Sequence, residues 1–102
     1  MSFTTLGLAP RLLDGVRQMG YTDPTPIQSE AIPRILEGAD VVGVAQTGTG
    51  KTAAFVLPML QRTPTRQGVR ALVVTPTREL ALQIAEVVRD VSRHTGHRAA
   101  VI

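Results

Sequence analysis

Residues 45 to 52 have the types and the spacing that bind a phosphate group. The segment reads Ala45-Gln46-Thr47-Gly48-Thr49-Gly50-Lys51-Thr52 and lies between the apolar run 41–45 and the helix-forming run 53–57. In a strand–loop–helix context, glycines let successive backbone N–H groups face one point, and the helix N-terminus adds a partial positive charge. The pattern predicts that Lys51 reaches the β- and γ-phosphates of a nucleotide and that the Thr52 hydroxyl faces Mg²⁺.

One position of this loop departs from the usual pattern, which begins with glycine where this chain has Ala45. The remaining residues also fit a flexible turn between a strand and a helix that binds nothing. The basic residues favour phosphate binding, because Lys51 is the only lysine in the chain and every other basic position is arginine. A compact ammonium and a forked guanidinium are not interchangeable at a phosphate.

A second cluster of polar groups follows the apolar run 70–75. Pro76, Thr77, Arg78 and Glu79 stand at the start of a predicted helix, where free N–H groups, a hydroxyl and a guanidinium come together. In a parallel sheet, this helix start and the one at Lys51 lie at the same edge, where ligands collect. The cluster fits the phosphates of a polymer backbone, and it also fits a capped helix with solvated charges.

Gln28 likewise has two interpretations. Three residues after Thr25, it completes a capping box at the start of a helix. An amide also carries the donor and the acceptor that match the N6/N7 edge of adenine.

The elements that must position these groups are an alternation of helices and apolar runs. Helices are predicted over 10–20, from Thr25 onward, over 51–62 and over 78–94. Two prolines lie inside these helices: Pro33 should split the second helix into two pieces, and Pro58 should kink the third. Strands are predicted over 41–45, 70–75 and 98–102, and the run within 70–75 is continuously apolar, as in a strand covered on both faces. The fold class is therefore α/β, a parallel sheet with flanking helices, incomplete at about three strands.

Composition limits the class of protein. The chain has 102 residues, 43% of them hydrophobic and 19% charged, which suits one small globular domain, and its net charge of +3 permits an anionic partner without identifying one. Its apolar runs are too short to cross a membrane, and the N-terminus does not read as a secretory signal. The absence of cysteine excludes disulfides and suits a cytoplasmic location. We also expect marginal stability for a chain this short.

No carboxylate follows a predicted strand, since the run 70–75 ends in Thr75-Pro76. Phosphoryl transfer needs an acidic residue there to hold the metal. The sequence predicts nucleotide binding without a complete hydrolytic site.

Three segments together resemble the N-terminal part of DEAD-box ATP-dependent RNA helicases. Residues 20–28, Gly20-Tyr21-Thr22-Asp23-Pro24-Thr25-Pro26-Ile27-Gln28, look like the family's Q motif, with Phe3 seventeen residues before Gly20 as its isolated aromatic. Residues 45–52 are similar to motif I, in which alanine at the first position is usual. Residues 76–81 look like motif Ia. The resemblance covers nearly the whole chain, and residues 3–8 with Gln46 lean toward the RhlE-like branch.

The resemblance implies a role for each segment. Gln28 would recognise adenine and Phe3 would stack on it, with Tyr21 nearby. Residues 45–52 would hold the phosphates of ATP, with Mg²⁺ bound through Thr52. Pro76, Thr77 and Arg78 would touch the RNA backbone.

It also implies a domain organisation. Residues 1–102 would be part of the first of two RecA-like domains, with a Q-motif region over 1–38 and a P-loop core portion over 39–102. The Asp-Glu-Ala-Asp and Ser-Ala-Thr motifs are absent from the chain. ATP hydrolysis and RNA unwinding are thus expected of a parent protein, and the chain alone should be inactive.

Two other classes remain as alternatives. A small P-loop kinase would place the loop near the chain start, whereas some forty residues precede it here. A non-catalytic nucleotide- or RNA-binding module would lack the acidic motif, as this chain does.

Overall fold

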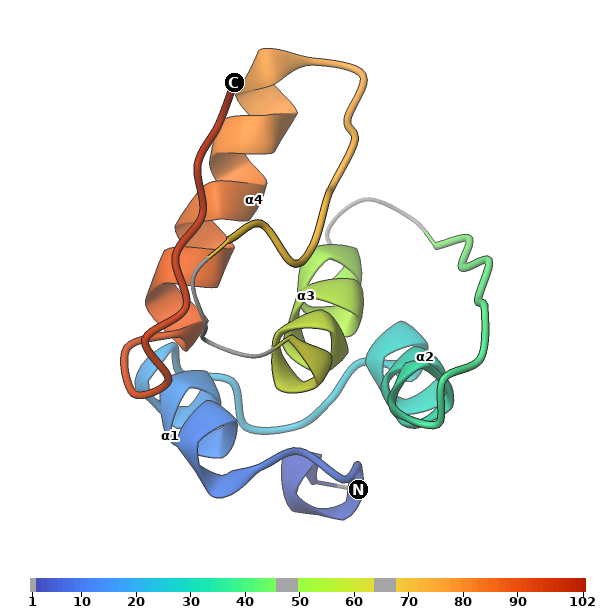
Figure 1. Cartoon of the computed structure of the whole chain (residues 1–102). Helices are drawn as coiled ribbons and strands as arrows, with labels where there is room; N and C mark the ends of the chain where they lie inside the picture. The colour runs from blue at the N-terminus through green and yellow to red at the C-terminus, as the bar shows by residue number, and fades with distance from the viewer. Residues whose placement is uncertain (1, 46–49, 64–67) are drawn as a thin grey trace.

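The computed structural model describes residues 2–45, 50–63 and 68–102. A short 3₁₀ helix, η1 (Phe3–Thr5), is followed by four α-helices: α1 (Pro10–Gln18), α2 (Pro26–Leu36), α3 (Lys51–Arg62) and α4 (Arg78–Val91). Figure 1 shows α3 between α2 and α4, with α1 beside the far end of α4. The predicted helix starts at Lys51 and Arg78 are confirmed, and α4 ends three residues earlier than the sequence indicated.

The helix α2 is one continuous helix, so the predicted division at Pro33 is wrong. Pro33 lies inside it, and the chain stays helical to Leu36. Proline removes the N–H that would bond to the Ser29 carbonyl, which is one backbone bond of the helix. Ala31 and Ile32, buried just before the proline, hold the helix against the core. Pro58 likewise lies inside α3, and its predicted kink stays a prediction.

The helix α3 is central because nearly all of its length is buried. It packs against both α2 and α4, and α1 packs against α4. The first helix approaches α4 closely at Gly15, where a Cβ atom would lie 2.4 Å from the carbonyl oxygen of Val91. The buried apolar core comes from the four helices and from residues 2–9, which we call the lead segment: Phe3, Leu6, Leu8, Leu12, Val16, Ile32, Ala53, Val56, Leu57, Leu60, Ile84, Val88 and Val91.

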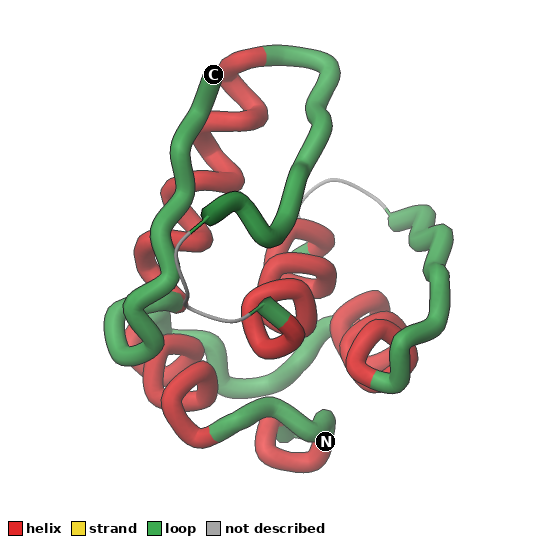
Figure 2. The backbone as a smooth tube through the Cα atoms, viewed as in Figure 1, coloured by secondary structure: helices red, strands yellow, loops and turns green. Residues whose placement is uncertain are grey.

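The three apolar runs predicted as strands are extended but carry no strand within the described ranges. Figure 2 shows 41–45, 69–75 and 98–102 as loops, set apart from one another. A strand requires a ladder of hydrogen bonds to a neighbouring strand, and none of these segments has one here. Their side chains are correspondingly open: Val42 is 95% exposed and Val74 is 83% exposed. The predicted three-stranded sheet is therefore not confirmed.

None of the helices in the described part of the chain has both the length and the apolar character needed to cross a membrane.

Candidate nucleotide-binding site

The start of α3 has backbone N–H groups free to bind an anion. Gly50 is the N-cap residue, with φ of 81°, a left-handed conformation that glycine adopts without strain. No side chain of the described segments caps the helix, and the Ala54 N–H is the one that bonds to the Gly50 carbonyl. The N–H groups of the first turn therefore point out of the helix end without a partner from the helix itself.

Two predicted ligand-binding side chains begin this helix. Lys51 is exposed and, in the ranges that the structure describes, makes no ion pair, so its ammonium is available to a phosphate. Thr52 follows as the second helical residue and is half-buried, as is Ala45 at the other end of the loop. The predictions for Gln46, Thr47, Gly48 and Thr49 lie outside the described residues.

Gln28 joins the start of α2 to the start of α3. Its side-chain oxygen accepts a hydrogen bond from the Thr25 N–H at 2.9 Å, and the Thr25 hydroxyl accepts one from the Gln28 N–H, so the predicted capping box is confirmed. Its amide nitrogen also donates to the Gly50 carbonyl at 3.2 Å. The residue is only 3% exposed. This contact spans 22 residues, and no local pattern in the sequence indicated it.

Both interpretations of Gln28 are compatible with this geometry. An amide oxygen has two lone pairs and an amide nitrogen has two hydrogens. The contacts to Thr25 and Gly50 use one of each. Among the described residues no other hydrogen bond to this side chain is formed, which leaves one acceptor and one donor, the pair that an adenine edge requires.

Glycine is needed at position 50 for a second reason. A Cβ atom there would lie 2.3 Å from the amide nitrogen of Gln28. Such an approach is far inside van der Waals contact, so a side chain at position 50 would displace the Gln28 amide from the Gly50 carbonyl.

Phe3 lies in the core beside Tyr21. The two rings are stacked, with centroids 6.4 Å apart and planes 18° apart, and Phe3 is 4% exposed. A hollow of about 300 Å³ opens beside them, lined in part by Leu13 and Val16 of α1. Nothing in this arrangement tests whether Phe3 stacks on a base.

The start of α4 offers a second set of exposed groups. Pro76, Thr77 and Arg78 are all exposed. Thr77 is the N-cap residue and its hydroxyl oxygen accepts the Leu80 N–H at 3.1 Å, so the capped-helix interpretation is correct for Thr77. The hydroxyl hydrogen is not used by this bond and can donate to a ligand. Arg78 makes no ion pair within the described segments.

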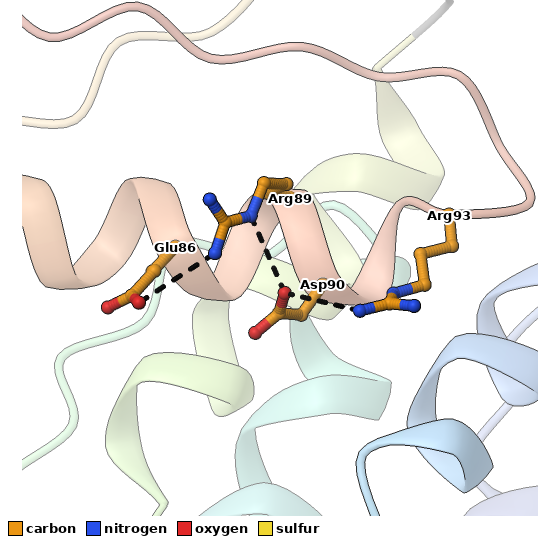
Figure 3. A network of polar contacts seen from close by, with 4 residues as sticks. All are labelled: Glu86, Arg89, Asp90 and Arg93. Carbon is orange, nitrogen blue, oxygen red and sulfur yellow. Dashed lines mark ion pairs between the residues drawn. The ribbon is translucent and has the colours of Figure 1, made fainter.

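Other arginines of α4 and its end already have acidic partners. Figure 3 shows Arg89 between Glu86 at 3.7 Å and Asp90 at 3.6 Å, with Arg93 at 4.0 Å from the same Asp90. These pairs are largely exposed, so they add little to stability. They do, however, distinguish Arg89 and Arg93 from Arg78 as candidates for phosphate contact.

Metal-binding residues in the described segments are sparse. No group of three His, Asp or Glu side chains gathers there. His97 contacts the Thr95 hydroxyl and the Thr63 carbonyl, each at 2.7 Å. Thr52 therefore stays the predicted magnesium ligand.

The helix start after a left-handed glycine, with Lys51 and Thr52 as its first residues, has the geometry expected of the phosphate-binding end of a P-loop protein. The sequence model of the family described as DEAD/DEAH box helicase matches residues 25–102. The chain belongs to this family.

Individual relatives are similar to this protein in sequence or in backbone structure over almost the whole chain. It is 50% identical to the ATP-dependent RNA helicase DBP10 of Candida albicans, over 99% of this chain and 11% of that protein. The crystal structure of the RNA helicase Prp28 from Chaetomium thermophilum bound to ADP superimposes with a TM-score of 0.86 at 44% identity, over 97% of this chain and 26% of that one. The structure of Dbp5 from S. cerevisiae bound to RNA and ADP BeF3 superimposes with a TM-score of 0.88 at 43% identity, over 93% of this chain and 25% of that one.

The chain thus spans about a tenth of this curated relative and about a quarter of these solved chains. Its backbone is that of part of a DEAD-box protein. The comparisons do not separate the RhlE-like branch from other members, so that assignment stays a prediction.

Proposed function

We propose that this chain is the ATP-binding portion of the first RecA-like domain of an ATP-dependent RNA helicase. The observation that carries the proposal is the contact between Gln28 and Gly50, because it brings a base-reading amide to the N-terminus of the phosphate-binding helix. The relative Prp28, solved with ADP, supports a nucleotide ligand.

Each end of the nucleotide has its own residues in this proposal. The free N–H groups of α3 and the Lys51 ammonium hold the phosphates, and the remaining donor and acceptor of Gln28 select adenine. Phe3 stacks on the base. Thr52 is the ligand of Mg²⁺, which when bound neutralises charge on the β- and γ-phosphate oxygens.

RNA is the proposed partner of the start of α4. Three groups there suit a phosphate backbone: the exposed Arg78 guanidinium, the hydrogen of the Thr77 hydroxyl and the N–H groups of the first turn. The relative Dbp5, solved with RNA, supports this partner. RNA unwinding and ATP hydrolysis belong to a longer protein that adds the acidic motif and a second RecA-like domain.

The extended segments have a place in the same proposal. We assign 41–45, 69–75 and 98–102 to parallel strands of a sheet whose intervening strands lie outside this chain. Three observations support the assignment: all three run in the same direction in Figure 1, their apolar side chains are open, and the backbone superimposes on solved DEAD-box proteins.

One experiment tests the nucleotide assignment. Calorimetric titration with ADP and with GDP, each with Mg²⁺, is run on the chain and on Gln28→Ala. We expect tighter binding of ADP than of GDP in the parent, and loss of this preference in the variant. Thr25→Ala is the matched control, because it removes half of the capping box and leaves the Gln28 amide in place.

The outcomes separate the two roles of Gln28. A preference lost in Gln28→Ala and kept in Thr25→Ala supports adenine selection. Equal binding of ADP and GDP by the parent leaves the phosphate site and returns Gln28 to capping alone. No binding by a folded parent contradicts the proposal and favours a module that has the family's fold without nucleotide binding.

A further inference from the structure

The last turn of α3 holds the lead segment through a single side chain. The Gln61 amide nitrogen donates to the Gly7 carbonyl at 2.8 Å, and its oxygen accepts from the Ala9 N–H. The partners are 54 and 52 residues away in the sequence. One amide therefore pairs with a backbone donor and a backbone acceptor at once, as a neighbouring strand would.

The lead segment has few other polar contacts to the rest of the protein. Its own hydrogen bonds are local, such as that from Leu6 N–H to the Phe3 carbonyl. Within the described ranges, Gln61 is the only side chain from outside the segment that bonds to it. Apolar burial of Phe3, Leu6 and Leu8 supplies the remaining attachment, and burial alone is non-directional. The direction of this segment therefore depends on Gln61.

The same helix carries the proposed phosphate contacts at its other end. It begins with Lys51 and Thr52 and reaches Gln61 in its last turn. A single helix thus fixes the spacing between the phosphate site and the segment that carries Phe3. Because Phe3 stacks on Tyr21, a shift of the lead segment moves that aromatic pair as well.

We propose that Gln61 is a positioning residue for base recognition: by holding Gly7 and Ala9, it places Phe3 relative to the phosphate-binding end of α3. This inference rests on the proposed function, in which Phe3 stacks on the base. Gln61 touches neither base nor phosphate and acts through the lead segment.

The test replaces Gln61 by methionine, which has a similar length and no amide. Binding of ADP, GDP and inorganic pyrophosphate, each with Mg²⁺, is measured by calorimetry on the 102-residue chain. We expect the affinities for ADP and for GDP both to fall at least fivefold in Gln61→Met, because stacking does not distinguish the two purines, with pyrophosphate affinity within twofold of the parent. The control is Gln83→Met, an exposed position on α4, which should leave all three affinities unchanged.

A second variant removes the same bond from the other side. Ala9 has φ of −67°, which proline adopts without strain, so Ala9→Pro deletes the N–H donor and leaves α3 untouched. It should lower the affinities for ADP and GDP in the same direction and leave pyrophosphate binding unchanged. This variant keeps the inference testable if Gln61→Met folds poorly.

Tyr21 gives a readout that is independent of nucleotide. It is the only tyrosine in a chain without tryptophan, so the intrinsic fluorescence of the protein reports on this residue alone. We expect acrylamide to quench it more strongly in Gln61→Met and Ala9→Pro than in Gln83→Met. Unchanged quenching would overturn the positioning role.

The nucleotide data distinguish the remaining outcomes. Unchanged affinities for ADP and GDP in Gln61→Met and Ala9→Pro overturn the inference and leave the proposed function intact. An equal loss of ADP, GDP and pyrophosphate binding overturns it too, because that pattern indicates a general structural role. A parent that binds ADP and GDP no more tightly than pyrophosphate makes no favourable contact with the base, which overturns both the base contacts of the proposed function and the inference.

Discussion

Gly50 is the residue at which three requirements meet. It has a positive φ, it is the N-cap residue of α3, and its carbonyl accepts a hydrogen bond from the Gln28 amide nitrogen. A side chain here is opposed both by backbone strain and by contact with Gln28. The two effects can be separated, because Gly20 has the same φ of 81° and a Cβ atom added there would have no neighbouring atom within 4 Å.

We therefore expect Gly50→Ala to lower the free energy of unfolding more than Gly20→Ala. Gly20→Ala should cost about 1–2 kcal/mol from left-handed strain alone. Gly50→Ala adds displacement of the Gln28 amide and should also abolish ADP preference. Urea denaturation monitored by circular dichroism, with ADP titration, measures both. Equal destabilisation by the two variants would show that the contact with Gln28 does not contribute to the free energy of unfolding.

Lys51 provides the second prediction at this scale. Removing its ammonium in Lys51→Ala should weaken ADP binding by about tenfold to a hundredfold, as expected for a charged hydrogen bond of about 1.5–3 kcal/mol. Stability should change little, because Lys51 is exposed. Calorimetric titration beside a thermal melt checks both statements. Lys51→Arg is the matched control: it keeps the charge, and only partial recovery is expected from its forked geometry.

At the scale of elements, Gly15 determines how closely α1 approaches α4. Helix propensity alone predicts that Gly15→Ala stabilises the protein by about 1 kcal/mol. The structure predicts the opposite sign, because the new Cβ atom would lie 2.4 Å from the Val91 carbonyl oxygen, a backbone atom that cannot rotate away. A lower urea midpoint in the variant would confirm the close packing, and a higher midpoint would contradict it.

The start of α4 supplies a prediction about RNA. Arg78→Ala should weaken binding of a single-stranded RNA and reduce its salt dependence, since one phosphate contact is lost. Arg89→Ala is the control on the same helix, because its guanidinium is already paired with Glu86 and Asp90. Fluorescence anisotropy at several salt concentrations measures both variants. Equal loss in the two would indicate a diffuse effect of charge.

The sequence predicted helix starts better than helix interiors or long-range contacts. Thr25 and Thr77 are N-caps as their local patterns indicated, because capping depends on residues three apart. Pro33 did not break α2, because burial of Ile32 outweighs one lost backbone bond. The contacts of Gln28 with Gly50 and of Gln61 with Gly7 join distant segments, and no local spacing encodes them.

For the whole molecule, the described core is built by helices and the lead segment alone. None of its members comes from 41–45, 69–75 or 98–102. These segments are as apolar as buried strands, yet Val44 is 90% exposed. The sequence identified their apolar character, and in the proposed sheet their pairing requires neighbouring strands. Exposed apolar segments with unpaired backbone groups promote self-association.

The last prediction uses this exposure. In the 102-residue chain, the double change Val44→Thr and Val74→Thr should reduce self-association, measured by light scattering, with little change in thermal stability, because both side chains are open. Val56→Thr is the control; that residue is fully buried, and a hydroxyl there should cost about 1–3 kcal/mol. Undiminished scattering by the double variant would show that these valines do not mediate association.

The same double change has the opposite consequence in a longer protein. If the extended segments become inner strands of a sheet, Val44 and Val74 are buried there and the two threonines must destabilise the domain. A chain extended to the length of the solved relatives should therefore melt at a lower temperature with the substitutions than without them. A neutral effect in both chains would contradict the assignment of these segments to a sheet. If the effect of the double substitution on the melting temperature changes from neutral to destabilising as the chain is lengthened, the added residues at which it changes are those that complete the sheet.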